Sequence, residues 1–192
     1  MKRALTAERA AWVRLRRGGI SNLVLWIGVL SSTVIYLGCS APPSQPTILY
    51  TNSLDSLEGI DPDDQIEVDE QTTYGPGASL SIHVNGAKTV EFADIPLDDG
   101  LGLGGVFEFR GHVRSRGLFG EAYLEIRVGR PDQPPVIRAA EPIRGTTDWN
   151  TQRVRIALAP GETADRVELV FVLEGQGLVW VDNIILVHIG ES

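Results

Sequence analysis

The feature that most restricts the fold of this chain is an alternation of apolar and polar residues that recurs through residues 47–192. Successive side chains of a β-strand point to opposite faces of a sheet, so this period is typical of strands with one buried face. A helical period does not persist beyond two turns in this part of the sequence. Four runs alternate most clearly, and their predicted buried faces are Phe107, Phe109, Gly111 and Val113; Ala122, Leu124, Ile126 and Val128; Val154, Ile156 and Leu158; and Val167, Leu169, Phe171 and Leu173.

Turn-forming sequences separate the alternating runs. The stretches YGPG, DDGLGLGG, RPDQPP and APGET are rich in the residues that supply the backbone angles and local hydrogen bonds of tight turns. Shorter strand candidates are TILYT, ASLSIHV and KTVEFA. We therefore expect an all-β domain of roughly eight to ten antiparallel strands, folded as a β-sandwich with jelly-roll rather than immunoglobulin topology.

Residues 1–38 have the features of a signal peptide or membrane segment. They hold six of the chain's 17 basic residues but only one of its 25 acidic residues, and they end in an uncharged apolar stretch, residues 20–37. A stretch of that length is almost long enough to span a hydrocarbon core of about 30 Å. The basic flank would remain on the cytoplasmic side, because loops rich in lysine and arginine are retained there.

Cys39, the only cysteine of the chain, follows Gly38 at the end of the apolar stretch. The sequence YLGCS resembles a bacterial lipobox, in which the cysteine is lipidated and becomes the first residue of the mature protein. This resemblance predicts Cys39 as a lipidation site. The alternative is an uncleaved transmembrane anchor, to which the same apolar residues would belong.

A short tether and a domain outside the cytoplasm follow from either anchor. Residues 39–46 contain three prolines, which favour an extended and semi-rigid conformation. Residues 47–192 would then be held at a membrane of the bacterial cell envelope, inner or outer. Since no second cysteine is available for a disulfide, the domain must be stabilised by its hydrophobic core.

The charge and the motifs of the sequence exclude several functions. The chain after residue 38 retains 11 basic and 24 acidic residues, and so acidic a surface repels a phosphate backbone, which excludes nucleic acid as a partner. The motifs HExxH and GxSxG, the P-loop and the Rossmann glycine pattern are absent from the sequence. We therefore expect a noncatalytic protein.

From about Thr47 onward, the order of segments resembles the jelly-roll carbohydrate-binding modules of the galactose-binding-like superfamily. LYTNSLDSLEG is similar to their opening strand and loop, and ASLSIHV to the strand that follows. The most specific part is GTTDWNTQRVRIALAPGETADRVELVFVLEGQGLVWVDNIIL, in which the matching residues are Trp149, Pro160, Gly175, Gly177, Trp180 and Asp182. The resemblance implies a sandwich that binds glycans or serves as an accessory module.

Tyr123 is the best outward-facing aromatic residue for a glycan site, because the alternation places it on a polar face with Arg110, His112 and Arg127. This face could form a shallow ligand site, or it could be a solvated sheet face with cross-strand Arg–Glu pairs. We expect an envelope-tethered binding module for carbohydrate. The alternative is a structural or protein-interaction lipoprotein domain, docked on another envelope protein and without a sugar site.

Asp182 lies inside the apolar run GLVWVDNIILV, where an unpaired carboxylate would be costly to bury. In the modules that this chain resembles, the aspartate of the closing strand reaches a structural calcium beside the first loop. The resemblance therefore implies calcium ligands at Asp182 and, from SLDSLEG, at Asp55 and Glu58, since calcium prefers carboxylate and carbonyl oxygens. The alternative is an Asp182 satisfied by backbone N–H groups of the opening loop or by an arginine, with no metal.

Overall fold

The computed structural model describes residues 45–61, 63–97 and 103–190. Every strand pairing in these residues is antiparallel, which confirms the predicted fold class. The strands are β1 (Pro46–Asn52), β2 (Ile66–Asp69), β3 (Ser79–Pro96), β4 (Leu103–Arg130), β5 (Gln133–Ala139), β6 (Ile143–Thr163) and β7 (Arg166–Ile189).

Nothing helical in the part of the chain that the structure describes has the length and apolar character needed to span a bilayer. The predicted signal segment, Cys39 and most of the tether lie outside the described residues.

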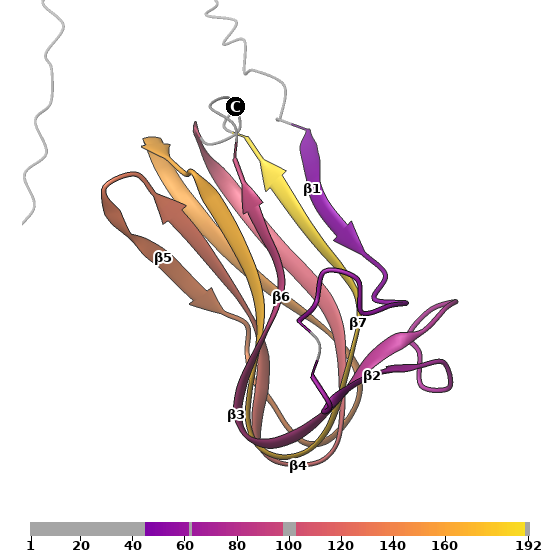
Figure 1. The fold of residues 1–192 in the computed structure, drawn as a ribbon. Helices are drawn as coiled ribbons and strands as arrows, with labels where there is room; N and C mark the ends of the chain where they lie inside the picture. The colour runs from indigo at the N-terminus through magenta and orange to yellow at the C-terminus, as the bar shows by residue number, and fades with distance from the viewer. Residues whose placement is uncertain (1–44, 62, 98–102, 191–192) are drawn as a thin grey trace, which may run out of the picture. The chain divides into compact units, whose positions relative to one another are not determined.

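Four of the strands are much longer than the sequence predicted, because pairs of expected strands are continuous. Residues 79–84 of ASLSIHV and all of KTVEFA belong to β3, and β7 contains both the alternating run of residues 167–173 and GLVWVDNIILV. Figure 1 shows the long strands running down one side of the domain, curving together, and returning on the other side. The jelly-roll sandwich is thus one sheet folded over on itself.

A row of glycines lies where the sheet folds over. Gly86 of β3 pairs with Gly175 of β7, which in turn pairs with Gly120 of β4. All three have positive φ angles, 107°, 108° and 137° respectively. A Cβ atom at Gly175 would lie 1.9 Å from the carbonyl oxygen of Phe119, so the backbones approach at this bend more closely than any side chain allows.

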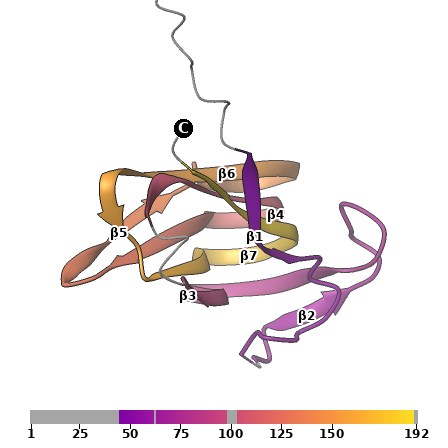
Figure 2. The same cartoon turned by 90° about the horizontal axis from the view of Figure 1, so that it is seen from above.

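The fold-over gives the sandwich two layers, which we call the first and the second layer. The first layer comprises β1, residues 79–85 of β3, residues 103–116 of β4, residues 147–163 of β6 and residues 177–189 of β7. The second layer comprises residues 87–96 of β3, residues 121–130 of β4, residues 166–174 of β7, and β5. β2 and the loops beside it extend to one side of the sandwich (Figures 1 and 2).

The core between the layers is formed by the residues that the alternation assigned to it. The largest buried side chains include Phe107, Phe109 and Phe171, each fully inaccessible to solvent. At Gly111 the layers are in close contact, since a Cβ atom there would lie 2.9 Å from Ile184 and 3.1 Å from Leu124. The other predicted core residues of the four alternating runs are all buried as well.

Candidate functional site

Asp182 lies on the outer face of the first layer, yet it is only 1% exposed, because the loop between β2 and β3 covers it. Its Oδ2 accepts a hydrogen bond of 2.8 Å from the backbone N–H of Tyr74, and the N–H groups of Gly75 and Asn183 lie near the carboxylate. Removal from water raises the pKa of Asp182, and the nearby Asp55 carboxylate adds to that rise. The N–H groups of Tyr74, Gly75 and Asn183 lower the pKa of Asp182 and so oppose this rise.

The loop that Asp182 holds carries Tyr74 onto the outer face of the first layer. The ring of Tyr74 stacks on His112, with ring centroids 3.4 Å apart and planes inclined by 10°. Trp149 meets Tyr74 edge-on, at 6.0 Å and 71°. These three residues form what we call the aromatic patch. Tyr74 is its most accessible member, with 50% of the residue exposed.

The local sequence holds this loop in place with short-range hydrogen bonds. Asp69 Oδ1 accepts from the N–H groups of Gln71 and Thr72, and Ser79 Oγ donates to the carbonyl of Thr72. At the other end, the N–H of Ala78 donates to Asp55 at 2.6 Å. The loop is therefore fixed from both sides, which orients the Tyr74 ring before any ligand arrives.

His112 lies under Tyr74 in surroundings that favour the neutral form of its ring. Burial lowers its pKa, and the positive charge of Arg110 adds to that effect, although the charge of Asp182 opposes it. Its Nδ1 lies 3.1 Å from the hydroxyl of Thr151 on β6, so its orientation is set by a neighbouring strand. An uncharged imidazole is a suitable stacking partner for the tyrosine ring.

Trp180, beside the patch, is covered rather than exposed. Its indole N–H donates to Asp69 at 2.8 Å, and the guanidinium groups of Arg114 and Arg116 lie over its ring at 5.7 and 5.4 Å from the centroid. Only 4% of the residue is accessible. Trp180 therefore supports the arginines of this face and does not offer a free stacking surface.

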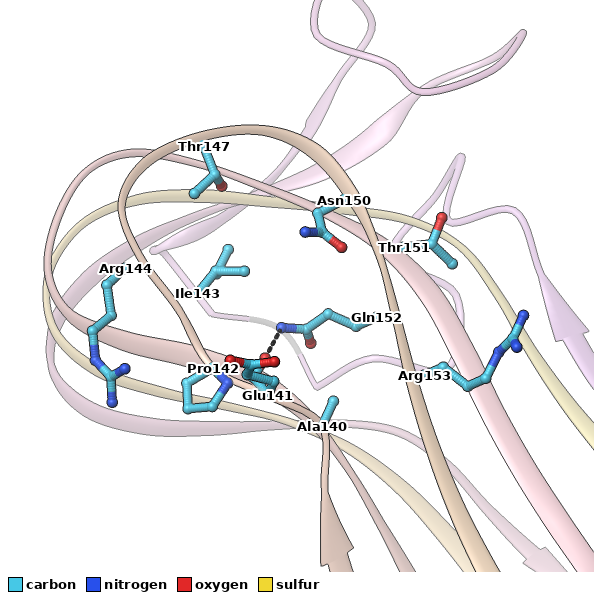
Figure 3. Close-up of a pocket in the computed structure, with 10 residues that line it drawn as sticks. All are labelled: Ala140, Glu141, Pro142, Ile143, Arg144, Thr147, Asn150, Thr151, Gln152 and Arg153. Atoms are coloured by element: carbon cyan, nitrogen blue, oxygen red, sulfur yellow. Dashed lines mark hydrogen bonds between the residues drawn. The ribbon is translucent and has the colours of Figure 1, made fainter.

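A pocket of about 520 Å³ opens at the edge of the first layer, between β6 and the segment that precedes it. Figure 3 shows Asn150 and Gln152 pointing into it, with Gln152 Nε2 donating to the carbonyl of Glu141 at 2.9 Å. Thr151 and Arg153 line the pocket as well as belonging to the strand beside the aromatic patch. Patch and pocket are thus neighbours along β6.

The structure does not bring the four predicted ligand residues to one face. Arg110 and His112 pair with the end of β7 in the first layer, whereas Tyr123 and Arg127 pair with its start in the second layer. The fold-over of β4 at Gly120 separates them, and this bend is what the sequence reasoning missed. Arg127 forms ion pairs with Glu125 at 2.7 Å and with Glu168 at 3.7 Å, as expected for a solvated charged face.

Two aromatic residues of the patch were not predicted as site residues. Trp149 has the same parity as Thr151 and Arg153, which point outward from β6, so extending the alternation by two residue pairs before Arg153 would have placed it on the outer face. Tyr74 precedes the Gly-Pro-Gly turn of the loop. No periodicity in the sequence could show that this loop crosses the first layer.

Two of the three predicted calcium ligands lie in one neighbourhood. Asp55 and Asp182 both accept from the loop between β2 and β3, through the N–H groups of Ala78 and Tyr74, while Glu58 is exposed in the first loop. Within the described residues, no three acidic, histidine or cysteine side chains converge as ligands. A calcium ion would therefore need backbone carbonyl oxygens besides these two carboxylates, and such a mixed donor set is one that calcium accepts.

No protein-family model and no curated protein matches the sequence. Among solved structures, the fold is similar to the CBM22-1 xylan-binding domain of Paenibacillus barcinonensis Xyn10C, with a TM-score of 0.53 and 14% identity over 80% of this chain and 100% of that one. It is also similar to the C-terminal family 22 carbohydrate-binding module of Clostridium thermocellum Xyn10B, with a TM-score of 0.51 and 14% identity over 76% of this chain and 95% of that one.

A third similar structure is part of a larger protein, the enzymatically active domain of tailspike protein 4 of bacteriophage CBA120. The TM-score is 0.51 at 16% identity, over 71% of this chain but only 20% of that one. At these identities the likeness concerns the fold, and it agrees with the strand topology described above. The chain has the jelly-roll β-sandwich fold that carbohydrate-binding modules adopt.

Proposed function

We propose that this domain is a noncatalytic carbohydrate-binding module and that its ligand lies across the aromatic patch on the first layer. The observation that carries the proposal is the group of Tyr74, His112 and Trp149, which gathers aromatic rings on a sheet face that is otherwise polar. Aromatic rings provide flat apolar surface at low entropic cost, which suits the apolar face of a sugar ring.

Polar groups around the patch would supply the hydrogen bonds that a glycan needs. Thr151 and Arg153 continue the face along β6. A ligand site of this kind combines apolar surface with a few polar groups that fix orientation. The similar domain of P. barcinonensis Xyn10C is xylan-binding, which supports a glycan rather than a protein as the ligand class.

A glycan-array screen of the full-length protein in detergent micelles tests the proposal. We expect Trp149→Ala and Tyr74→Ala to reduce binding at least tenfold, since aromatic stacking contributes roughly 0.5–1.5 kcal/mol beyond the apolar area that it buries. Tyr74→Ala keeps the N–H that bonds Asp182, so the loop should remain in place. Phe119→Ala is the matched control, because Phe119 is an exposed aromatic (83%) at the bend of β4. Absence of binding to every glycan would contradict the proposal.

The proposal includes a structural calcium ion held by Asp55 and Asp182. A cation there would offset the burial of Asp182 and the repulsion between the two carboxylates. Bound calcium should raise the melting temperature, because a ligand at a hundredfold excess over its Kd stabilises the folded state by about 2.7 kcal/mol. Asp182→Asn and Asp55→Asn should remove the response, whereas Glu58→Gln tests the third predicted ligand. A melting temperature that ignores both calcium and chelator would contradict the site.

The location that we propose is the bacterial cell envelope, with the module held at a membrane through lipidated Cys39. The support is the sequence alone, since residues 1–44 lie outside the described residues. A module tethered at one end, with its glycan face on the first layer, would contact polysaccharide outside the cytoplasm.

A further inference from the structure

The first layer gathers positive charge on an acidic domain. Five of the 11 basic residues that follow residue 38 lie on β4 and β6 of this layer: Arg110, Arg114, Arg116, Arg153 and Arg155. The second layer also carries five basic residues, but four of them form ion pairs with their own acidic partners: Lys88 with Asp63, Arg127 with Glu125 and Glu168, Arg130 with Glu162, and Arg166 with Asp94. The first layer differs in how its arginines are paired.

Three of these arginines share a single carboxylate, and we call them, with Glu108, the arginine cluster. Arg110 and Arg153 each place Nε 3.4 Å from Glu108 Oε1, and Arg155 bonds Glu108 Oε2. The Glu108 side chain is only 7% exposed, whereas those of Arg110, Arg153 and Arg155 are 36%, 50% and 56% exposed. The guanidinium groups therefore cover the carboxylate and face the solvent, with two positive charges left uncompensated.

The register makes this arrangement costly for folding alone. Arg110 lies directly opposite Arg153 in the β4–β6 pairing, and like charges in that position destabilise a sheet. In addition, Nε of Arg110 is buried and, apart from its ion pair with Glu108 at 3.4 Å, has no hydrogen-bond partner in the described residues. If the arginine cluster served only to keep this face of the sheet hydrated, its positive and negative charges would balance. Local conflicts of this kind are typical of functional sites.

The arginine cluster is continuous with the aromatic patch. The residue pairs Glu108–Arg155, Arg110–Arg153 and His112–Thr151 follow one another along the same outer face of β4 and β6. Successive pairs on one face of a strand are about 7 Å apart. The arginines therefore begin one pair away from the imidazole on which Tyr74 stacks.

We propose that the ligand of this site is an anionic polysaccharide whose sugars carry carboxylates, with one sugar on the aromatic patch and the carboxylate of a neighbouring sugar on the arginine cluster. This inference rests on the proposed function and names its ligand class. The guanidinium fork matches a carboxylate in bidentate geometry, which a lysine cannot do. The only lysine after residue 38, Lys88, is on β3 and is paired with Asp63 at 2.5 Å.

The test is calorimetric titration of the full-length protein in detergent with polygalacturonate and with its fully methyl-esterified form. We expect the free acid to bind at least tenfold more tightly than the ester, with an affinity that falls as salt rises. Arg153→Gln and Arg155→Gln should each weaken binding of the free acid several-fold and weaken binding of the ester much less. Arg138→Gln is the matched control, because Arg138 is exposed on β5 and donates to the carbonyl of Ile137.

Further variants and ligands distinguish recognition of a carboxylate from other modes of binding. Arg153→Lys keeps the charge near Glu108, so a loss of affinity in this variant at unchanged melting temperature would support carboxylate recognition over simple charge. Equal binding of acid and ester, sensitive to Trp149→Ala, would overturn the inference and leave the proposed function standing. Binding of dextran sulfate or of anionic phospholipid vesicles as tightly as polygalacturonate would overturn the carboxylate assignment. Absence of binding to every glycan would remove both proposals.

Discussion

The carboxylate of Asp182 and the backbone N–H of Tyr74 are joined by a hydrogen bond of 2.8 Å across 108 positions of the sequence. This bond connects the closing strand of the sandwich with the loop that carries the aromatic patch. An acidic residue inside an apolar strand thus positions a loop, because its buried carboxylate accepts from the N–H of Tyr74. The same residue contributes to the stability of the domain and to the geometry of its proposed ligand site.

The first prediction concerns this hydrogen bond. Asp182→Ala in the presence of chelator should lower the free energy of unfolding by about 1–3 kcal/mol, because buried N–H groups would lose their acceptor. Asp182→Asn should not show this loss, since the amide oxygen still accepts from Tyr74. Urea denaturation measures both values. Equal losses for the two variants would mean that this hydrogen bond does not stabilise the loop.

The second prediction is a pH dependence with a defined sign. The pKa of Asp182 is raised above its ordinary value of 3.8 mainly by burial, so the folded state binds this proton more tightly than the unfolded state. Between pH 3.8 and the raised pKa, the contribution of Asp182 to stability should therefore fall as pH rises. The pKa of Asp55, lowered by the N–H of Ala78, contributes with the opposite sign.

The difference between wild type and Asp182→Asn isolates this effect, because the other carboxyl groups are common to both proteins. The urea midpoints of the two proteins are measured at a series of pH values, all in chelator. The midpoints should be similar at low pH, and the midpoint of the wild type should fall below that of Asp182→Asn as Asp182 ionises. A difference that does not vary with pH would show that Asp182 titrates alike in the folded and unfolded states.

The alternation of the sequence predicted the core because burial of one sheet face is a local property of each strand. Phe107, Leu124, Ile156 and Phe171 are all buried as their parity required. The separation of Tyr123 from His112 was not predictable in this way, since parity continues unchanged through a bend. Which glycines mark a fold-over, and which mark a turn, depends on how three strands align, and this alignment is a long-range property.

The third prediction separates the two costs of replacing a glycine at this bend. Gly86 and Gly175 have nearly equal φ angles, 107° and 108°, but a Cβ atom at Gly86 meets no atom within 4 Å, whereas one at Gly175 would lie 1.9 Å from a carbonyl oxygen. Gly86→Ala should therefore cost about 1–3 kcal/mol from backbone strain alone. Gly175→Ala should cost substantially more, as measured by thermal melting and by the yield of folded protein. Similar losses in the two variants would show that φ, and not close approach, requires glycine here.

The fourth prediction concerns the anchor, which lies outside the described residues. Cys39→Ser should release the domain from membranes or leave an unprocessed precursor, because serine offers no thiol for lipidation. Membrane fractionation and mass spectrometry of the isolated protein measure this outcome. An intact leader, residues 1–38, on the wild-type membrane protein would favour a transmembrane anchor instead.

The last prediction concerns Gln152, a buried amide that connects the two layers beside the edge pocket. Its Oε1 accepts from the N–H of Leu124 at 2.7 Å, and its Nε2 donates to the carbonyls of Glu141 at 2.9 Å and Ala122 at 3.4 Å. Gln152→Leu keeps similar volume but leaves a buried N–H without its acceptor, so we expect a loss of about 1–3 kcal/mol in urea denaturation. Asn150→Ala is the control, because Asn150 is an exposed residue of the same strand and pocket and should change stability by less than about 0.5 kcal/mol. A stability of Gln152→Leu equal to that of the control would mean that water replaces the amide at this edge of β4, and that Gln152 does not hold the layers together.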